Sequence, residues 1–236
     1  MRGATVIALI GIDGAGKTTQ AKALADRLRA AGVPATYFEN PGGRPLWNRL
    51  AHALGRRDGP HLFGRTGYVA LEASVRWLAI ARAVLVSRLT GRAAVMDRWS
   101  WCQYVVMRVR GDRGGRLARL AYGIFPRPGV VCFLAVSPEV AQQRVLARGI
   151  DTEELPYLRA LDAGYRELPE FGTFTVVDAD GGPAEVRAAL DRVLRTALGP
   201  APEVRDRRAA LRRPARRLAA RGQPRRSSQR RRSDRR

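Results

Sequence analysis

Apolar residues form two patterns that alternate along the chain, one typical of buried strands and one typical of helices. Five short runs are almost continuously apolar, which is typical of buried parallel strands: Thr5–Ile10, Ala35–Phe38, Ala93–Met96, Val130–Val136 and Phe174–Val177. The segments between them space their apolar residues as one face of a helix. They are Lys17–Ala31, Leu46–Leu54, Thr66–Leu89, Trp101–Tyr122 with a break at Gly111–Gly115, a helix that begins at Ser137-Pro138 and ends near Arg148, Glu153–Leu168 and Ala184–Leu198. Strands alternating with helices predict a three-layer α/β fold around a five-stranded parallel sheet.

A glycine-rich loop joins the first strand to the first helix. The segment Gly11–Thr18 reads GIDGAGKT and matches the phosphate-loop pattern G-x-x-x-x-G-K-[ST]. Such a loop wraps backbone N–H groups around phosphates, and the helix N-terminus adds a partial positive charge. The sequence therefore predicts a P-loop NTPase fold that binds ATP. The predicted ATP-binding residues are Gly11, Asp13, Gly14, Ala15, Gly16, Lys17, Thr18 and Thr19.

The loop also predicts how charge is neutralised during the reaction. Lys17 would reach the β- and γ-phosphates, and the hydroxyl of Thr18 would bind Mg²⁺. Asp97 follows the apolar run Ala93–Met96, where this fold places a second acid on the metal. We therefore expect ATP and Mg²⁺ as cofactors, with Thr18 and Asp97 at the metal.

The positive charge is unevenly distributed. The formal net charge is +22, and residues 203–236 hold 15 arginines against 3 acids, so this tail carries +12. We expect a kinase domain over residues 1–200 and a disordered Arg-rich tail over 201–236. The tail is interpreted as a solvated extension without function, as a nonspecific binder of nucleic acid, or as a segment for anionic membranes.

Two further features of the sequence indicate the cellular compartment of the protein. Arg82, Arg88 and Arg92 interrupt the apolar stretch Trp77–Met96, so it is not expected to span a membrane. The chain has 2 cysteines, which indicates no disulfide framework and fits a reducing compartment. We expect a cytoplasmic protein.

Four segments resemble the thymidylate kinase family of nucleoside monophosphate kinases. They are the phosphate loop with its internal acid Asp13, the segment Asn40–Pro45, which is similar to E-P-G-G-T-P, the signature Asp97-Arg98-Trp99, and Val177-Asp178-Ala179 after the last strand. The resemblance covers residues 5–198. It implies transfer of the ATP γ-phosphoryl group to a nucleoside monophosphate, with dTMP the favoured acceptor. It also implies pairing into a homodimer through long helices beside the sheet.

The resemblance carries roles to individual residues. Asp13 would face the acceptor sugar, Arg98 would hold the acceptor phosphate, and Arg76 would contact the acceptor base or phosphate. Tyr165 matches a family tyrosine near the acceptor. Arg144 and Arg148 precede a lid at about residues 148–156 and would cover the transferring group.

The chain departs from the family at the acceptor base. Glu72 stands where the family usually has a phenylalanine that stacks on thymine, and Asn40, Cys102 and Ala135 replace other family residues. Glu72 has three interpretations. It forms a helix-surface ion pair with Arg76, four residues on; it accepts hydrogen bonds from a different base; or the register assigned to this helix is one turn wrong.

These departures leave two other functions open. One is a kinase of the same fold acting on another nucleotide or on a nucleoside, although Arg98 favours a phosphorylated acceptor. The other is a nucleotide-binding protein without turnover, whose tail binds nucleic acid.

Overall fold

A central sheet of five parallel strands organises the molecule. The computed structural model describes residues 5–149 and 153–198, all within the first of the chain's two units, Met1–Pro202. The strands are β1 (Val6–Ile10), β2 (Ala35–Glu39), β3 (Ala93–Asp97), β4 (Val130–Ala135) and β5 (Thr175–Asp178). They lie in the order β2-β3-β1-β4-β5, and every neighbouring pair is parallel. The predicted α/β fold with a five-stranded parallel sheet is confirmed.

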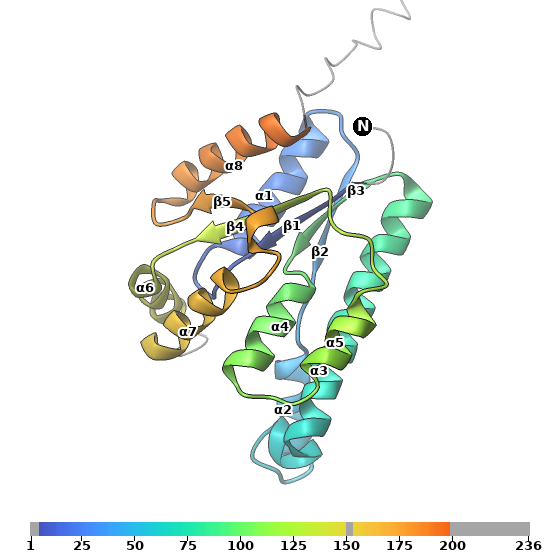
Figure 1. Ribbon diagram of the computed structural model, residues 1–236, viewed down its shortest axis with the longest axis vertical. Helices are drawn as coiled ribbons and strands as arrows, with labels where there is room; N and C mark the ends of the chain where they lie inside the picture. The colour runs from blue at the N-terminus through green and yellow to red at the C-terminus, as the bar shows by residue number, and fades with distance from the viewer. Residues whose placement is uncertain (1–4, 150–152, 199–236) are drawn as a thin grey trace, which may run out of the picture. The chain divides into compact units, whose positions relative to one another are not determined.

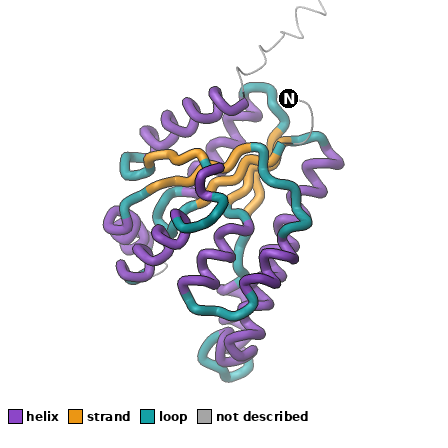
Figure 2. Tube along the Cα trace, in the orientation of Figure 1, coloured by secondary structure: helices purple, strands orange, loops and turns teal. Residues whose placement is uncertain are grey.

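Helices cover both faces of the sheet (Figures 1 and 2). They are α1 (Lys17–Ala30), α2 (Arg44–Ala53), α3 (Gly59–Thr90), α4 (Ser100–Val109), α5 (Gly115–Tyr122), α6 (Pro138–Arg148), α7 (Leu155–Arg166) and α8 (Pro183–Leu198), with a short 3₁₀ turn at Phe171–Thr173. In Figure 1, α1 and α8 lie on one face, and α3, α4 and α7 lie on the other. The three inner strands are buried between two helical layers, which explains why β1, β3 up to Asp97 and β4 are apolar without alternation.

The strand order brings the candidate chemistry to one edge. β1 lies between β3 and β4, so the chain reverses its direction of winding beside β1. The register pairs Leu9 with Asp97, which places this acid beside the start of the glycine loop. Open parallel sheets bind ligands at the carboxyl ends of strands at such a switch point.

Local details differ from the sequence prediction at two helices. α3 begins at Gly59 and not near Thr66, because Gly64 adopts φ 69° and joins two helical pieces across a kink. Ser137 precedes α6 as predicted, but its hydroxyl does not cap the helix. It donates instead to Asp180 Oδ1 at 2.9 Å, so Ser137 stands at the N-cap position without the side-chain cap that a serine there would be expected to supply.

Several predictions fall partly or wholly outside the described residues. The tail 201–236 does so entirely, and so do the lid residues 150–152. Within the part of the chain that the structure describes, no helix has the length and apolar character needed to cross a membrane.

Candidate active site

The turn between β1 and α1 needs glycine for both conformation and space. Gly11, Gly14 and Gly16 have φ of 143°, 88° and 82°, which side chains disfavour. A Cβ on Gly11 would lie 2.7 Å from the carbonyl oxygen of Leu134, and one on Gly14 would collide with the backbone of Ala141. The loop is therefore pressed against β4 and α6, with its backbone free to surround an anion.

Lys17 is buried at the start of α1, and its ammonium is held by the loop itself. Nζ donates to the carbonyl of Ile12 at 2.6 Å and lies 3.4 Å from Asp13 Oδ1. Burial and the nearby charge of Arg98 lower the pKa of Lys17, and Asp13 and Asp97 only partly oppose this effect. An anionic phosphate in the loop would supply the compensating charge that this lysine lacks.

Asp97 and Thr18 meet at the carboxyl edge of the sheet. Asp97 is fully buried, and its Oδ2 accepts a hydrogen bond from the Thr18 hydroxyl and lies 3.4 Å from the Tyr37 hydroxyl. Burial and the charge of Asp97 raise the pKa of Tyr37, so this phenol stays protonated. A hydroxyl and a carboxylate in contact are hard oxygen donors that fit Mg²⁺, with phosphate oxygens and water completing its shell.

Arg98 occupies a strained position between the loop and the cavity beside it. Its φ is 78°, and it is the sole non-glycine residue with positive φ in the described ranges 5–149 and 153–198. Such strain persists where the surrounding structure enforces it, often at functional sites. The guanidinium donates to Asp13 Oδ1 and lies 3.5 Å from Asp97 Oδ1.

The neighbouring cations keep the carboxyl group of Asp13 deprotonated. Burial alone would raise the pKa of Asp13, but the charges of Lys17 and Arg98 outweigh burial and hold it well below its usual range. The carboxylate is therefore ionised at neutral pH, and it can accept hydrogen bonds only.

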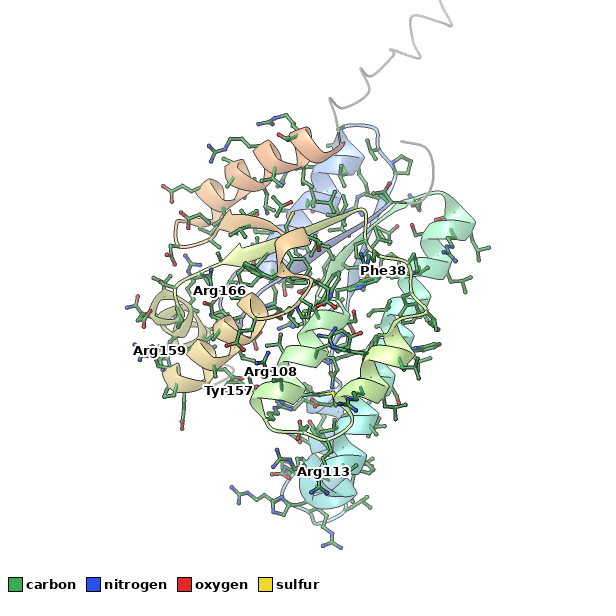
Figure 3. The ribbon with its side chains drawn as sticks, in the orientation of Figure 1. Phe38, Arg108, Arg113, Tyr157, Arg159 and Arg166 are labelled. Carbon is green, nitrogen blue, oxygen red and sulfur yellow. The ribbon has the colours of Figure 1, made fainter. Side chains whose placement is uncertain are left out.

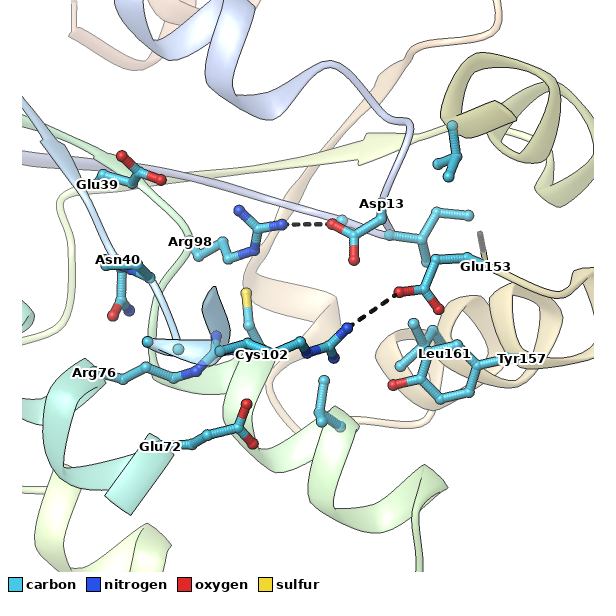
Figure 4. A pocket seen from close by; sticks show the side chains of 18 of the residues that line it. Asp13, Glu39, Asn40, Glu72, Arg76, Arg98, Cys102, Glu153, Tyr157 and Leu161 are labelled. Atoms are coloured by element: carbon cyan, nitrogen blue, oxygen red, sulfur yellow. Dashed lines mark hydrogen bonds and ion pairs between the residues drawn. The ribbon is translucent and has the colours of Figure 1, made fainter. Parts of the chain in front are cut away.

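A cavity of about 310 Å³ opens beside the loop (Figure 4). Its walls come from the loop, from the turn after β2, and from α3, α4, α6 and α7. The predicted residues that line it are Gly11, Asp13, Glu72, Arg76, Arg98, Arg148 and Tyr165. The tertiary structure thus brings together side chains that are far apart in the sequence, and all those predicted for the acceptor are among them.

Tyr165 lines this cavity from α7. It is buried, and its ring centroid lies 5.4 Å from that of Phe133 on β4. Burial and the neighbouring Cys102 raise its pKa, so the phenol remains neutral beside Arg98.

Glu72 is placed differently from its simplest interpretation. It is only 2% exposed, and its Oε2 lies 3.2 Å from Nη1 of Arg110 at the end of α4. Among the described residues its ion pair joins it to Arg110 and not to Arg76. The interpretation as a helix-surface ion pair with Arg76 is therefore wrong, because Glu72 is buried in the cavity wall, where Arg110 of α4 reaches it.

Arg144 binds backbone on the other side of the loop. Its guanidinium donates to the carbonyls of Ala179 at 2.7 Å, Asp180 at 2.7 Å and Gly181 at 2.8 Å. It also lies 3.5 Å from the carbonyl of Gly14. Arg144 thus joins α6 to the turn after β5, and it is not among the residues that line the cavity.

The predicted lid is described only at its two ends. Arg148 is exposed and lines the cavity. Beyond residues 150–152, Glu153 lies 3.7 Å from Nη1 of Arg44, the first residue of α2, and both residues line the cavity.

Several cavity residues received no site role from the sequence. Arg110 and Tyr157 line the cavity without belonging to any motif, while Asn40 and Arg44 lie in the segment Asn40–Pro45 but were given no role of their own. Figure 3 labels Tyr157 on α7, the helix that packs against α4. Arg110 directly precedes the helix break at Gly111, but nothing local signals that this end of α4 faces a site.

A phosphate loop that opens onto a cavity lined with arginines is how P-loop enzymes move a phosphoryl group between two substrates. The fold and the site together define the chain as a P-loop phosphotransferase. The family model described as thymidylate kinase matches residues 10–190. The chain belongs to the thymidylate kinase family and is a nucleoside monophosphate kinase with ATP as its phosphoryl donor.

Several relatives named as thymidylate kinases match this chain over nearly their whole length. A probable thymidylate kinase of Archaeoglobus fulgidus is 29% identical over 195 residues, which cover 82% of this chain and 96% of the relative. The thymidylate kinase of Dinoroseobacter shibae is 31% identical, with 79% and 93% covered. That of Pseudomonas fluorescens is 30% identical, with 81% and 95% covered. The family resemblance predicted from the motifs is confirmed.

Proposed function

We propose that this chain transfers the γ-phosphoryl group of ATP to dTMP, with Mg²⁺ held by Thr18 and Asp97. The observation that carries the proposal is the position of Arg98, between the phosphate loop and the arginine-lined cavity. One guanidinium there can contact both the acceptor phosphate and the group in transfer. The relatives' names support dTMP as acceptor. Because both substrates are free nucleotides, we place the enzyme in the cytoplasm.

The chain's own residues supply positioning and charge rather than covalent chemistry. Lys17 would leave the carbonyl of Ile12 and contact the β- and γ-phosphates, while the loop N–H groups surround them. Arg98 would hold the acceptor phosphate in line. Asp13 would receive the acceptor sugar hydroxyl, since its ionised carboxylate accepts hydrogen bonds. Arg148 would cover the transferring group and exclude water.

The test is ADP release measured with ATP and Mg²⁺ and with dTMP, dUMP, dCMP, dAMP, dGMP or thymidine supplied separately. We expect dTMP to be turned over fastest and thymidine not at all, because Arg98 needs a phosphate to bind. Preference for another monophosphate would replace dTMP in the proposal. Tight ATP binding without turnover of any acceptor would refute it.

Replacing each of the two arginines of α6 with alanine should change a different kinetic constant. Arg144→Ala removes the hydrogen bonds that hold Ala179–Gly181 near the loop, and we expect the KM for ATP to rise about 10-fold with little change in the KM for dTMP. Arg148→Ala should lower kcat about 10- to 100-fold with the KM for ATP nearly unchanged. Steady-state kinetics with each substrate varied in turn would check this. Equal effects of the two variants on kcat would show that Arg144 acts on the transferring group instead.

We also propose that the enzyme is a homodimer built on α3 and α5. The two helices are joined by hydrogen bonds from Trp77 to Ala121 and from Tyr122 to Ala73, and they form an apolar groove. Leu78 and Leu117 line this groove and are 61% and 69% exposed. Large exposed apolar surfaces usually mark interaction sites.

Sedimentation would test this assembly. We expect wild type to have the mass of a dimer, and Leu78→Glu with Leu117→Glu to have that of a monomer with a similar unfolding temperature. Leu146→Glu, at an exposed position on α6, is the matched control and should remain dimeric. A monomeric wild type would exclude the proposal.

For the tail we propose nonspecific binding of nucleic acid through residues 203–236. Its support is the sequence alone, because 15 arginines in 34 residues would release many counterions from a phosphate backbone. Nucleic-acid affinity that is unchanged after deletion of 203–236 would exclude this role.

A further inference from the structure

The Glu72–Arg110 ion pair lies in the wall of the acceptor cavity. Glu72 comes from the middle of α3 and Arg110 from the C-terminal cap of α4, so the pair joins two of the helices that line the cavity. Both residues line the space directly. Glu72 Oε2 accepts a hydrogen bond from Nη1 of Arg110. The other carboxylate oxygen, Oε1, lies near the turn after β2, 3.2 Å from the position that a Cβ on Gly42 would occupy.

Stability does not account for such a pair. Removing a carboxylate and a guanidinium from water costs several kcal/mol, and their attraction often only balances this cost. Apolar residues of similar volume would join α3 to α4 at least as well. In the wall of a ligand cavity, the buried Glu72 and the partly exposed Arg110 instead supply placed polar groups of the kind that fix the orientation of a bound ligand.

Further polar groups on the same side of the cavity lack partners. Among the described residues, both amide atoms of Asn40 and Nε of Arg76 are buried without a hydrogen bond. Figure 4 shows Asn40, Arg76 and Glu72 along one side of the cavity, with Tyr157 across from them. Buried polar groups are almost always satisfied, so these atoms point to hydrogen bonds made by a bound ligand.

We propose that the edge of the acceptor base is bound by this pair: the Glu72 carboxylate accepts the N3–H of thymine, and the Arg110 guanidinium donates to an adjacent carbonyl oxygen. This inference rests on the proposed function and names how its acceptor is selected. Thymine and uracil offer a ring donor beside a carbonyl acceptor. Cytosine has a lone pair at N3, which a carboxylate repels.

The experiment compares dTMP with its N3-methyl derivative, which lacks the N3–H donor. We expect wild type to prefer dTMP by about 10- to 100-fold in kcat/KM, as expected for loss of one hydrogen bond to a charged group. The preference should fall to about 1- to 3-fold in Glu72→Ala. Glu72→Gln keeps an acceptor oxygen without the charge, so its preference should be intermediate. Thermal unfolding of each variant verifies that it is folded.

Glu139→Ala is the matched control, because Glu139 forms an exposed ion pair with Arg159 at 2.7 Å. It should keep the wild-type preference. Normal turnover of dTMP with no preference over the N3-methyl compound would overturn the inference and leave the proposed function standing. So would a preference that is the same in Glu72→Ala and in Glu72→Gln as in wild type. A wild-type enzyme that does not phosphorylate dTMP would overturn both.

Discussion

Replacing Lys17 with alanine should lower kcat for dTMP phosphorylation by about 10²- to 10³-fold, the usual effect of removing one preorganised charge from a transition state. Lys17 is buried at the base of the phosphate loop. Among the described residues, Ile12 and Asp13 are the hydrogen-bond partners of its ammonium. The effect should appear mainly in kcat, because charge on the transferring group is greatest in the transition state.

The chain provides its own control for this prediction. Lys22 is the only other lysine, and it lies exposed on α1 with its ammonium 5.4 Å from the centroid of the Tyr37 ring. Lys22→Ala should retain wild-type kcat and KM. Near-normal turnover by Lys17→Ala, measured by ADP release, would mean that another group neutralises the phosphates and that the role assigned to the loop lysine is wrong.

Replacing Arg98 with alanine should lower kcat/KM for dTMP by about 10²- to 10³-fold and leave ATP binding nearly intact. Arg98 is the cation that faces both the loop and the cavity, and its loss also leaves Asp13 without its closest partner. Arg98→Lys should recover only part of the activity, because a lysine lacks the planar two-pronged donor. Arg108→Ala removes an exposed ion pair with Glu167 on the same side of the sheet and should have no effect.

The backbone at this position allows a second, independent measurement. Arg98 has φ 78°, which glycine adopts freely and alanine does not. Arg98→Gly should therefore be more stable than Arg98→Ala by about 1 kcal/mol. Both variants should have the same low activity, since the side chain is lost in each. Higher activity in the glycine variant, measured beside the unfolding temperature, would show that backbone strain and not the guanidinium is what matters.

Much of the fold and part of the site follow from short stretches of sequence. The continuous apolar runs predict buried parallel strands, and both ends of all five runs fall within one residue of the observed strand ends. The segment Gly11–Thr18 predicts its own conformation, because only glycine tolerates the backbone angles of an anion-binding turn. Asp97 could be placed from its position at the end of an apolar run.

By itself the sequence thus determined the layer architecture, the phosphate loop and the family, since each depends on residues near one another along the chain. Only the tertiary structure decided the partner of Glu72, which lies 38 positions away, and the attachment of Arg144 to carbonyls 35 to 37 positions away. It also decided the burial of Asn40 and the entry of Arg110 and Tyr157 into the cavity wall. Local periodicity indicates which face of a helix is apolar, but the partner of a buried charge depends on how helices distant in sequence pack against one another.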